Sequence, residues 1–190
     1  MWCDSHMDIV RPEMIHLASY VVALKKAIIL DTIDIENAQR NLSEIDSDPD
    51  SFLAKQEDPE ALGGDVKLPD GSCVPRIPGM TRWMWDGEVC GAINFRWQVG
   101  TTELPPTCLG HIGYEVLSWK RNRGYASEAL RQILPEATKL KMPFVELSTD
   151  IDNLISQRVI AKAGGVLHEK FVKPPAYGGN REGLRFRIYL

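Results

Sequence analysis

The sequence predicts an α/β domain in which helices flank a mixed central sheet. Three observations support this fold class. Two apolar segments flank Asp86-Gly87, a dipeptide that strongly favours a β-hairpin. A long amphipathic segment with helical spacing follows Gly124. Strand and helix patterns then alternate to the end of the chain, which favours a right-handed crossover between neighbouring strands.

The first third of the chain is expected to be helical and then irregular. Apolar residues recur every three or four positions within residues 14–45, which predicts one or two helices. Residues 46–79 are rich in Asp, Pro and Gly, which predicts turns and loops. A loop of this length is either a functional lid or binding edge, or a plain surface excursion, and its composition favours neither.

Three strands and a long helix are expected next. Residues 83–85 and 89–99 form the predicted hairpin, and residues 109–116 form a third strand. The following helix has one apolar stripe, made of Ala126, Ala129, Leu130, Ile133, Leu134, Ala137 and Leu140. Pro135 removes a backbone donor inside this stripe, so we expect a kink or an early helix end there.

The last part of the chain predicts a strand, a helix and a strand pair. Residues 144–149 read as a strand, and residues 153–163 as a helix closed by Gly164-Gly165. Residues 166–172 and 184–190 then form the terminal pair of strands. The sequence contains no internal repeat.

Length and composition indicate a single globular domain over residues 7–190. The chain has 190 residues, of which 44% are hydrophobic and 25% charged, enough to build one sizeable core. Ser5-His6-Met7 resembles a cloning scar, so residues 1–6 are interpreted as a tag remnant. A formal net charge of −4 gives no general support for binding nucleic acid.

Cysteine usage and hydropathy favour a cytoplasmic protein. Cys3, Cys73, Cys90 and Cys108 form no C-x-x-C pair and have no histidine at zinc-ligand spacing, so we expect reduced thiols and no metal. The most apolar stretch, residues 21–30, contains two lysines and is about half as long as a membrane span. The start of the chain lacks a signal-peptide pattern, so neither export nor a membrane partner is expected.

Residues 110–126 have the design of a pyrophosphate site. A short strand runs into a basic turn that contains Arg121, Arg123 and Gly124, and then directly into a helix. A helix start leaves about four N–H groups without intrahelical partners, and its dipole attracts anions. The sequence has neither G-x-x-x-x-G-K-[ST] nor G-x-G-x-x-G, which disfavours ATP and NAD.

An ordered set of motifs resembles the GNAT superfamily of acetyl-CoA-dependent N-acetyltransferases. The set covers residues 74–190 and consists of Val74-Pro75, Gly110-His111-Ile112-Gly113-Tyr114, Arg121-x-x-Gly124-x-Ala126, Asp152-Asn153, Ser156 and Gly164-Gly165. The chain looks closest to a group of small predicted acetyltransferases. In the superfamily the pattern [QR]-x-x-G-x-[GA] grips the pyrophosphate of coenzyme A.

The resemblance implies the GNAT fold, in which two neighbouring strands splay apart and hold acetyl-CoA without any metal. The cofactor-binding residues it implies are Tyr114, Val116, Arg121, Asn122, Arg123, Gly124, Tyr125, Ala126, Ser127, Asn153 and Ser156. A backbone N–H near Val116 would polarise the thioester carbonyl. Asn153 and Ser156 have a structural alternative, as a helix cap and a small packing residue. Arg158 and Lys162 either reach the 3'-phosphate or are solvated.

The chain departs from some relatives at the positions of their catalytic residues. Those relatives use a Glu five residues before the motif Asn and a Tyr seven after it, whereas this chain has Ser148 and Ile160. Three candidates for the general base remain: Glu115, Glu146 and His111. Each of the three also has a structural interpretation. The hypothesis that we test is that Glu115 is the general base.

The resemblance predicts an acyltransferase that moves acetyl from acetyl-CoA to a primary amine by direct attack in a ternary complex. The alternative is a non-catalytic domain that binds acyl-CoA as a sensor or assembly element. The acceptor is a small-molecule or peptide amine that the sequence does not identify, and dimers are frequent among relatives. The strand aromatics Trp83, Trp85, Phe95 and Trp97 are read as packing, or else as an acceptor-pocket wall. Tyr177 would line the acceptor entrance or a dimer contact.

Overall fold

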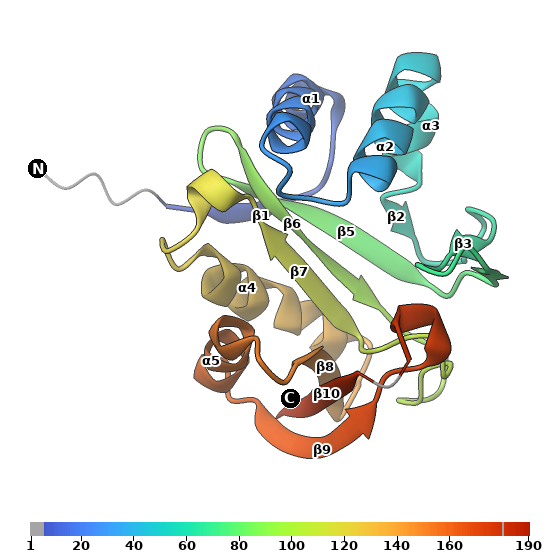
Figure 1. Ribbon diagram of the computed structural model, residues 1–190, viewed down its shortest axis with the longest axis vertical. Coiled ribbons are helices and arrows are strands. Elements are labelled where there is room, and N and C mark those ends of the chain that lie inside the picture. The colour runs from blue at the N-terminus through green and yellow to red at the C-terminus, as the bar shows by residue number, and fades with distance from the viewer. Residues whose placement is uncertain (1–5, 180) are drawn as a thin grey trace, which may run out of the picture.

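The computed structural model describes residues 6–179 and 181–190, and its helices and strands alternate as the sequence predicts (Figure 1). The helices are α1 (Met14–Ile29), α2 (Ile35–Ser47), α3 (Pro49–Ala54), α4 (Tyr125–Lys139) and α5 (Leu154–Lys162), with the 3-10 helices η1 (Ser118–Lys120) and η2 (Pro175–Tyr177). The strands are β1 (Asp8–Val10), β2 (Glu57–Asp58), β3 (Val66–Lys67), β4 (Cys73–Val74), β5 (Gly79–Trp85), β6 (Val89–Arg96), β7 (Ile112–Val116), β8 (Phe144–Asp150), β9 (Val166–Val172) and β10 (Glu182–Tyr189).

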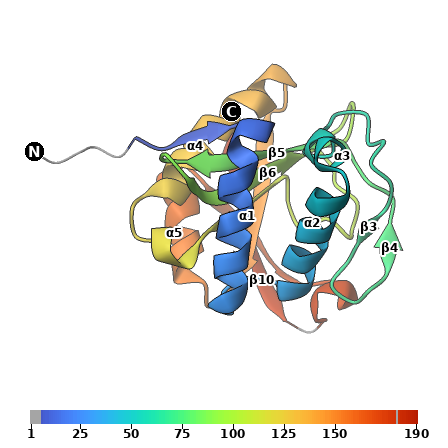
Figure 2. The same ribbon diagram turned by 90° about the horizontal axis from the view of Figure 1, so that it is seen from above.

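The first sheet has the strand order β1-β5-β6-β7, with β2 also paired to β5. Helices α1 to α3 cover one face, and α4 packs on the other (Figures 1 and 2). Strand alternation sends Ile93 and Phe95 into the core under α4, and Trp83 into a second cluster under α1. The hairpin between β5 and β6 is confirmed, and Gly87 supports its turn with φ 106°.

The second sheet has the order β8-β10-β9, and both of its ladders are antiparallel. It meets the first sheet where β7 lies beside β8. There the His111 N–H donates to the Glu146 carbonyl oxygen at 2.7 Å, and the Glu146 N–H donates to His111 Nδ1 at 2.9 Å. The predicted α/β class with a splayed strand pair is confirmed, but β7 and β8 form no parallel ladder among the described residues. The two strands therefore separate beyond this junction.

The structure differs from the sequence-based expectations at two places. Residues 46–79 contain helix α3 as well as loops, because the Asp48 carboxylate accepts from the Ser51 N–H at 2.9 Å and Pro49 occupies the first turn. Of the two alternatives expected at Pro135, an early helix end is wrong, because α4 continues to Lys139, while a kink stays a prediction. The proline removes one backbone donor, while burial of Ile133 and Ala137 on either side of it keeps the helix on the sheet.

The C-terminal elements follow the sequence closely. Helix α5 ends as Gly164 adopts φ 85° and the Gly165 N–H donates to the Ile160 carbonyl oxygen at 2.9 Å. No helix in residues 6–179 and 181–190 is both long and apolar enough to cross a membrane. Cys73, Cys90 and Cys108 are unpaired thiols, whereas Cys3 and most of the predicted tag remnant, residues 1–5, lie outside the described residues.

We expect Gly110→Ala to destabilise the junction between the two sheets. A Cβ at residue 110 would stand 2.9 Å from the Glu146 carbonyl oxygen and 3.2 Å from the Leu147 Cα, so backbone would have to move. The expected loss in the free energy of unfolding is about 2 kcal/mol, measured by urea denaturation. Gly100→Ala is the control, since open space surrounds that position and only its positive φ adds a cost of about 1 kcal/mol. Equal losses for the two variants would contradict the close-approach argument.

Candidate functional site

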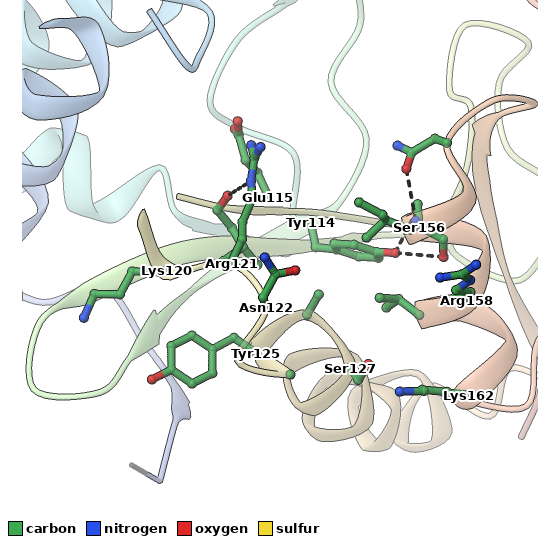
Figure 3. Close-up of a pocket in the computed structure, with 16 residues that line it drawn as sticks. Tyr114, Glu115, Lys120, Arg121, Asn122, Tyr125, Ser127, Ser156, Arg158 and Lys162 are labelled. Carbon is green, nitrogen blue, oxygen red and sulfur yellow. Dashed lines mark hydrogen bonds between the residues drawn. The ribbon is translucent and has the colours of Figure 1, made fainter. Parts of the chain in front are cut away.

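A cavity of about 670 Å³ opens between the free edge of β7, the start of α4 and one face of α5 (Figure 3). Its lining residues are Tyr114, Glu115, Val116, Lys120, Arg121, Asn122, Gly124, Tyr125, Ala126, Ser127, Asn153, Ile155, Ser156, Arg158, Val159 and Lys162. Ten of the eleven predicted cofactor-binding residues are in this set. The exception is Arg123, whose half-exposed side chain lies 3.9 Å from the Asp86 carboxylate.

The turn before α4 presents main-chain donors to this cavity. Asn122 and Gly124 adopt left-handed conformations with φ 62° and 81°, which these two residue types tolerate best. The Glu128 N–H makes an early helical bond to the Gly124 carbonyl oxygen at 3.0 Å, and no side chain caps the helix. The N–H groups of Ala126 and Ser127 precede that bond, so they are available to an anion at the positive end of the helix dipole.

A buried carboxylate on the neighbouring hairpin holds this turn in place. Asp86, with a side chain only 5% exposed, accepts two 2.9 Å bonds from the Lys120 ammonium and one of 2.7 Å from the Tyr125 hydroxyl. Glu88 lies 2.7 Å from the same ammonium. Burial alone would raise the pKa of Asp86, but the bonds from Tyr125 and Lys120 outweigh it and lower the pKa to about 2. Lys120 therefore stabilises the conformation of the turn.

The free edge of β7 offers a second set of main-chain groups. The Leu117 N–H donates to the Cys90 carbonyl oxygen, and the Arg96 N–H donates to the His111 carbonyl oxygen, each at 2.9 Å. Because an antiparallel strand alternates its hydrogen-bonding sides, the main-chain groups of Tyr114 and Val116 point away from β6 and toward the gap. Arg121 Nε donates to the Val116 carbonyl oxygen at 3.0 Å, which places its guanidinium beside this edge.

Helix α5 closes the other side of the cavity. The Asn153 side chain caps the helix by accepting from the Ser156 N–H at 3.0 Å, so its structural reading holds while it also lines the cavity. Ser156 Oγ lies 2.8 Å from the Tyr114 hydroxyl, which reaches across from β7 (Figure 3). A second cavity of about 260 Å³ lies between β7 and β8 and shares Tyr114, Asn153 and Ser156 with the first.

The charge of the lining suits a phosphorylated ligand. Arg121, Arg158 and Lys162 line the cavity, and none of the three forms a salt bridge within residues 6–179 and 181–190, although the Arg121 guanidinium attracts the Glu115 carboxylate. Glu115 is the one acidic residue of the lining set. Arg158 and Lys162, which the sequence left open between phosphate contact and solvation, thus lie on the cavity side of α5 (Figure 3).

The three candidate bases occupy different surroundings. Glu115 lines the large cavity, where partial burial raises its pKa, while the Arg121 guanidinium opposes that rise. Glu146 lines neither cavity and forms ion pairs with Arg187 at 2.9 Å and Arg185 at 3.7 Å. His111 is 0% exposed, and burial lowers its pKa to about 4. The His111 Nδ1 accepts the Glu146 N–H. Neither His111 nor Glu146 lines either cavity, so the structure does not bring these two candidates to the site.

No cluster of three or more His, Cys, Asp or Glu side chains in the described part of the chain could hold a metal ion.

Tyr177 on η2 lies apart from the cavity, and its hydroxyl donates to the Thr107 carbonyl oxygen at 2.8 Å. The strand aromatics pack inside the domain, with Trp83 stacked on Tyr20 and Phe95 tilted against Trp97.

The chain belongs to the GNAT acetyltransferase family, because the family model described as an acetyltransferase (GNAT) domain matches residues 72–166. By family it is therefore a GNAT-type N-acetyltransferase. No curated protein sequence matches the chain significantly.

Several solved acetyltransferase structures share its fold. RimJ of Mycobacterium smegmatis, solved with CoA-disulfide, superposes with a TM-score of 0.62 at 16% identity over 96% of this chain and 81% of that chain. The microcin C7 self-immunity acetyltransferase MccE, solved with acetyl-CoA and AMP, gives 0.59 at 10% identity over 97% and 92%. RimL, a ribosomal L7/L12 α-N-protein acetyltransferase solved with coenzyme A, gives 0.58 at 10% identity over 97% and 94%. At such identities the likeness establishes the fold alone.

We expect Asp86→Asn to lower stability by about 3 kcal/mol, because it leaves the buried Lys120 ammonium with only the exposed Glu88 carboxylate as a charged partner. Thermal unfolding measures the loss. Since the folded pKa of Asp86 is depressed to about 2 from 3.8, its stabilisation is fully present above pH 4 and is lost as the pH falls toward 2. The difference between wild type and variant should shrink over that interval. A difference independent of pH would show that the Asp86 charge does not stabilise the fold.

Proposed function

We propose that the protein transfers an acetyl group from acetyl-CoA to a primary amine by direct attack in a ternary complex. The observation that carries the proposal is that a helix start with uncapped N–H groups and a free strand edge face one cavity. The N–H groups at the start of α4 can bind a diphosphate, and the free edge of β7 can pair with the amides of a pantetheine arm. The residues present therefore fit acetyl-CoA, and residues 7–190 form one such domain.

The side chains of the cavity extend this fit. Arg121 lies between the turn and the β7 edge, and Arg158 and Lys162 on α5 offer unpaired cations for the remaining phosphate. The Val116 N–H, which points toward the gap, is suited to stabilise negative charge on the thioester oxygen as the amine attacks. These roles use only main-chain donors and fixed cations.

Glu115 is the proposed general base. An attacking amine must be neutral and must lose a proton, and a carboxylate with a raised pKa accepts that proton more readily near neutral pH. Glu146 and His111 remain weaker candidates. Glu146 is engaged in ion pairs with two arginines, and His111 is buried away from the cavity. The proposed acceptor is a small-molecule or peptide amine in the cytoplasm, and a homodimer is compatible with this activity.

We expect Arg121→Met to weaken coenzyme A binding about tenfold, since a charge-assisted contact to a phosphate is lost from the turn. Isothermal titration calorimetry with coenzyme A measures the dissociation constant. Arg40→Met on the exposed surface of α2 is the matched control and should bind as the wild type does. An unchanged dissociation constant for Arg121→Met would remove this residue from the site.

We expect Glu115→Gln to lower kcat about a hundredfold or more while the affinity for acetyl-CoA is kept, because the amide cannot take the amine proton. The assay is coenzyme A release across a panel of amines, with acetyl-CoA affinity measured in parallel. Glu60→Gln, at an exposed position, is the control. Full activity of Glu115→Gln would eliminate Glu115 as the base.

The same panel separates catalysis from a sensor or assembly role. A wild-type chain that binds acetyl-CoA but releases no coenzyme A with any amine would favour the non-catalytic reading. If acetyl-CoA fails to raise the melting temperature at all, the proposed site itself is wrong.

A further inference from the structure

We propose that the Tyr114 hydroxyl is the general acid that protonates the sulfur of departing coenzyme A. This inference rests on the proposed acetyl transfer and assigns a residue to its last step. Acetyl transfer expels a thiolate, which leaves more readily when a positioned donor supplies a proton. Ile160, which lines the second cavity, has no proton to give.

Tyr114 spans the gap between β7 and α5. Its backbone lies on the free edge of β7, and its ring crosses the gap to α5, where the hydroxyl lies 2.8 Å from Ser156 Oγ (Figure 3). Tyr114, Asn153 and Ser156 line both the 670 Å³ cavity and the 260 Å³ cavity. The hydroxyl therefore lies where a chain threaded along the β7 edge passes from one cavity into the other.

The other polar groups at this junction are poorer acids. Asn153 has only an amide, and its oxygen is engaged in the helix cap. The Ser156 hydroxyl is far less acidic than a phenol. Lys173 lines the second cavity, but its ammonium is paired with Asp150, and Lys120 is bound to Asp86. Of the groups lining both cavities, Tyr114 has the most readily dissociated proton.

The Tyr114 hydroxyl is protonated at neutral pH. Partial burial raises the pKa of the hydroxyl, and the bond with Ser156 opposes this rise without cancelling it. At neutral pH the side chain is therefore a neutral donor. In the resting state Ser156 Oγ holds the hydroxyl at the junction, and either oxygen of the pair can donate to the other.

In the proposed transfer, each bond that forms is matched by a bond that breaks. The lone pair of the amine nitrogen forms the N–C bond to the acetyl carbon, and the C–S bond breaks with its electron pair moving to sulfur. Tyr114 gives its proton to that sulfur, which yields a thiol and a tyrosinate. Glu115 takes the proton that the nitrogen loses and then releases it to solvent, and solvent returns one proton to Tyr114, so both side chains regain their starting states. The products are the N-acetyl amine and the free thiol.

The test compares Tyr114→Phe with the wild type in the intact chain. We expect kcat with an accepted amine to fall about a hundredfold, while the dissociation constant for acetyl-CoA changes less than about threefold. Ser156→Ala keeps the phenol and should lose much less. Tyr189→Phe is the matched control, since Tyr189 is 64% exposed at the end of β10.

A readout without turnover accompanies the kinetics. A phenol that donates to sulfur stabilises the thiolate, so the pKa of the thiol of bound coenzyme A should be about one unit higher in Tyr114→Phe than in the wild type. Thiolate absorbance in the ultraviolet measures this pKa. Equal thiol pKa values in the two proteins, or equal kcat values, would overturn the assignment. A wild type that binds acetyl-CoA without turnover would refute the proposed function, and the thiol pKa would still test Tyr114.

Discussion

The buried Asp86 carboxylate is the interaction on which the geometry of the site depends. It lies on the β5–β6 hairpin, yet its partners are Lys120 before the basic turn and Tyr125 at the first position of α4. One charge thus connects the sheet to both ends of the turn. A turn with two left-handed residues would sample many conformations by itself, and this connection selects one of them. The main-chain donors of α4 are preorganised as a result.

The second requirement is an edge strand that stays open. Strand β7 pairs with β6 on one side only, and the junction of His111 with Glu146 brings β8 close at one point. Glycine at position 110 permits that approach, and the strands then diverge around two connected cavities. Sheet edges usually need protection against unwanted pairing. Here the open groups of Tyr114 and Val116 lie inside a cavity covered by α5.

Much of this architecture was predictable because its signals are local. The Asp86-Gly87 turn, the stripe of α4 and the glycines after α5 each report on a few neighbouring residues, and the basic turn at a helix start is likewise a local pattern. The partners of Asp86 were not predictable, since Lys120 and Tyr125 are more than thirty positions away in sequence. Strand alternation placed Glu146 near the site, but the arginines of β10 that engage it belong to a pairing no local pattern specifies. Whether Arg158 and Lys162 face ligand or solvent was likewise decided by the packing of α5.

The uncapped start of α4 has a consequence for how the protein responds to its surroundings. Amide hydrogens do not ionise at any physiological pH, and the arginine beside them stays charged throughout. In the proposed complex, the charge that these groups present to the diphosphate therefore stays constant near neutral pH. In the proposed mechanism, recognition of the diphosphate at the start of α4 and acid–base chemistry by side chains of β7 are thus assigned to different groups.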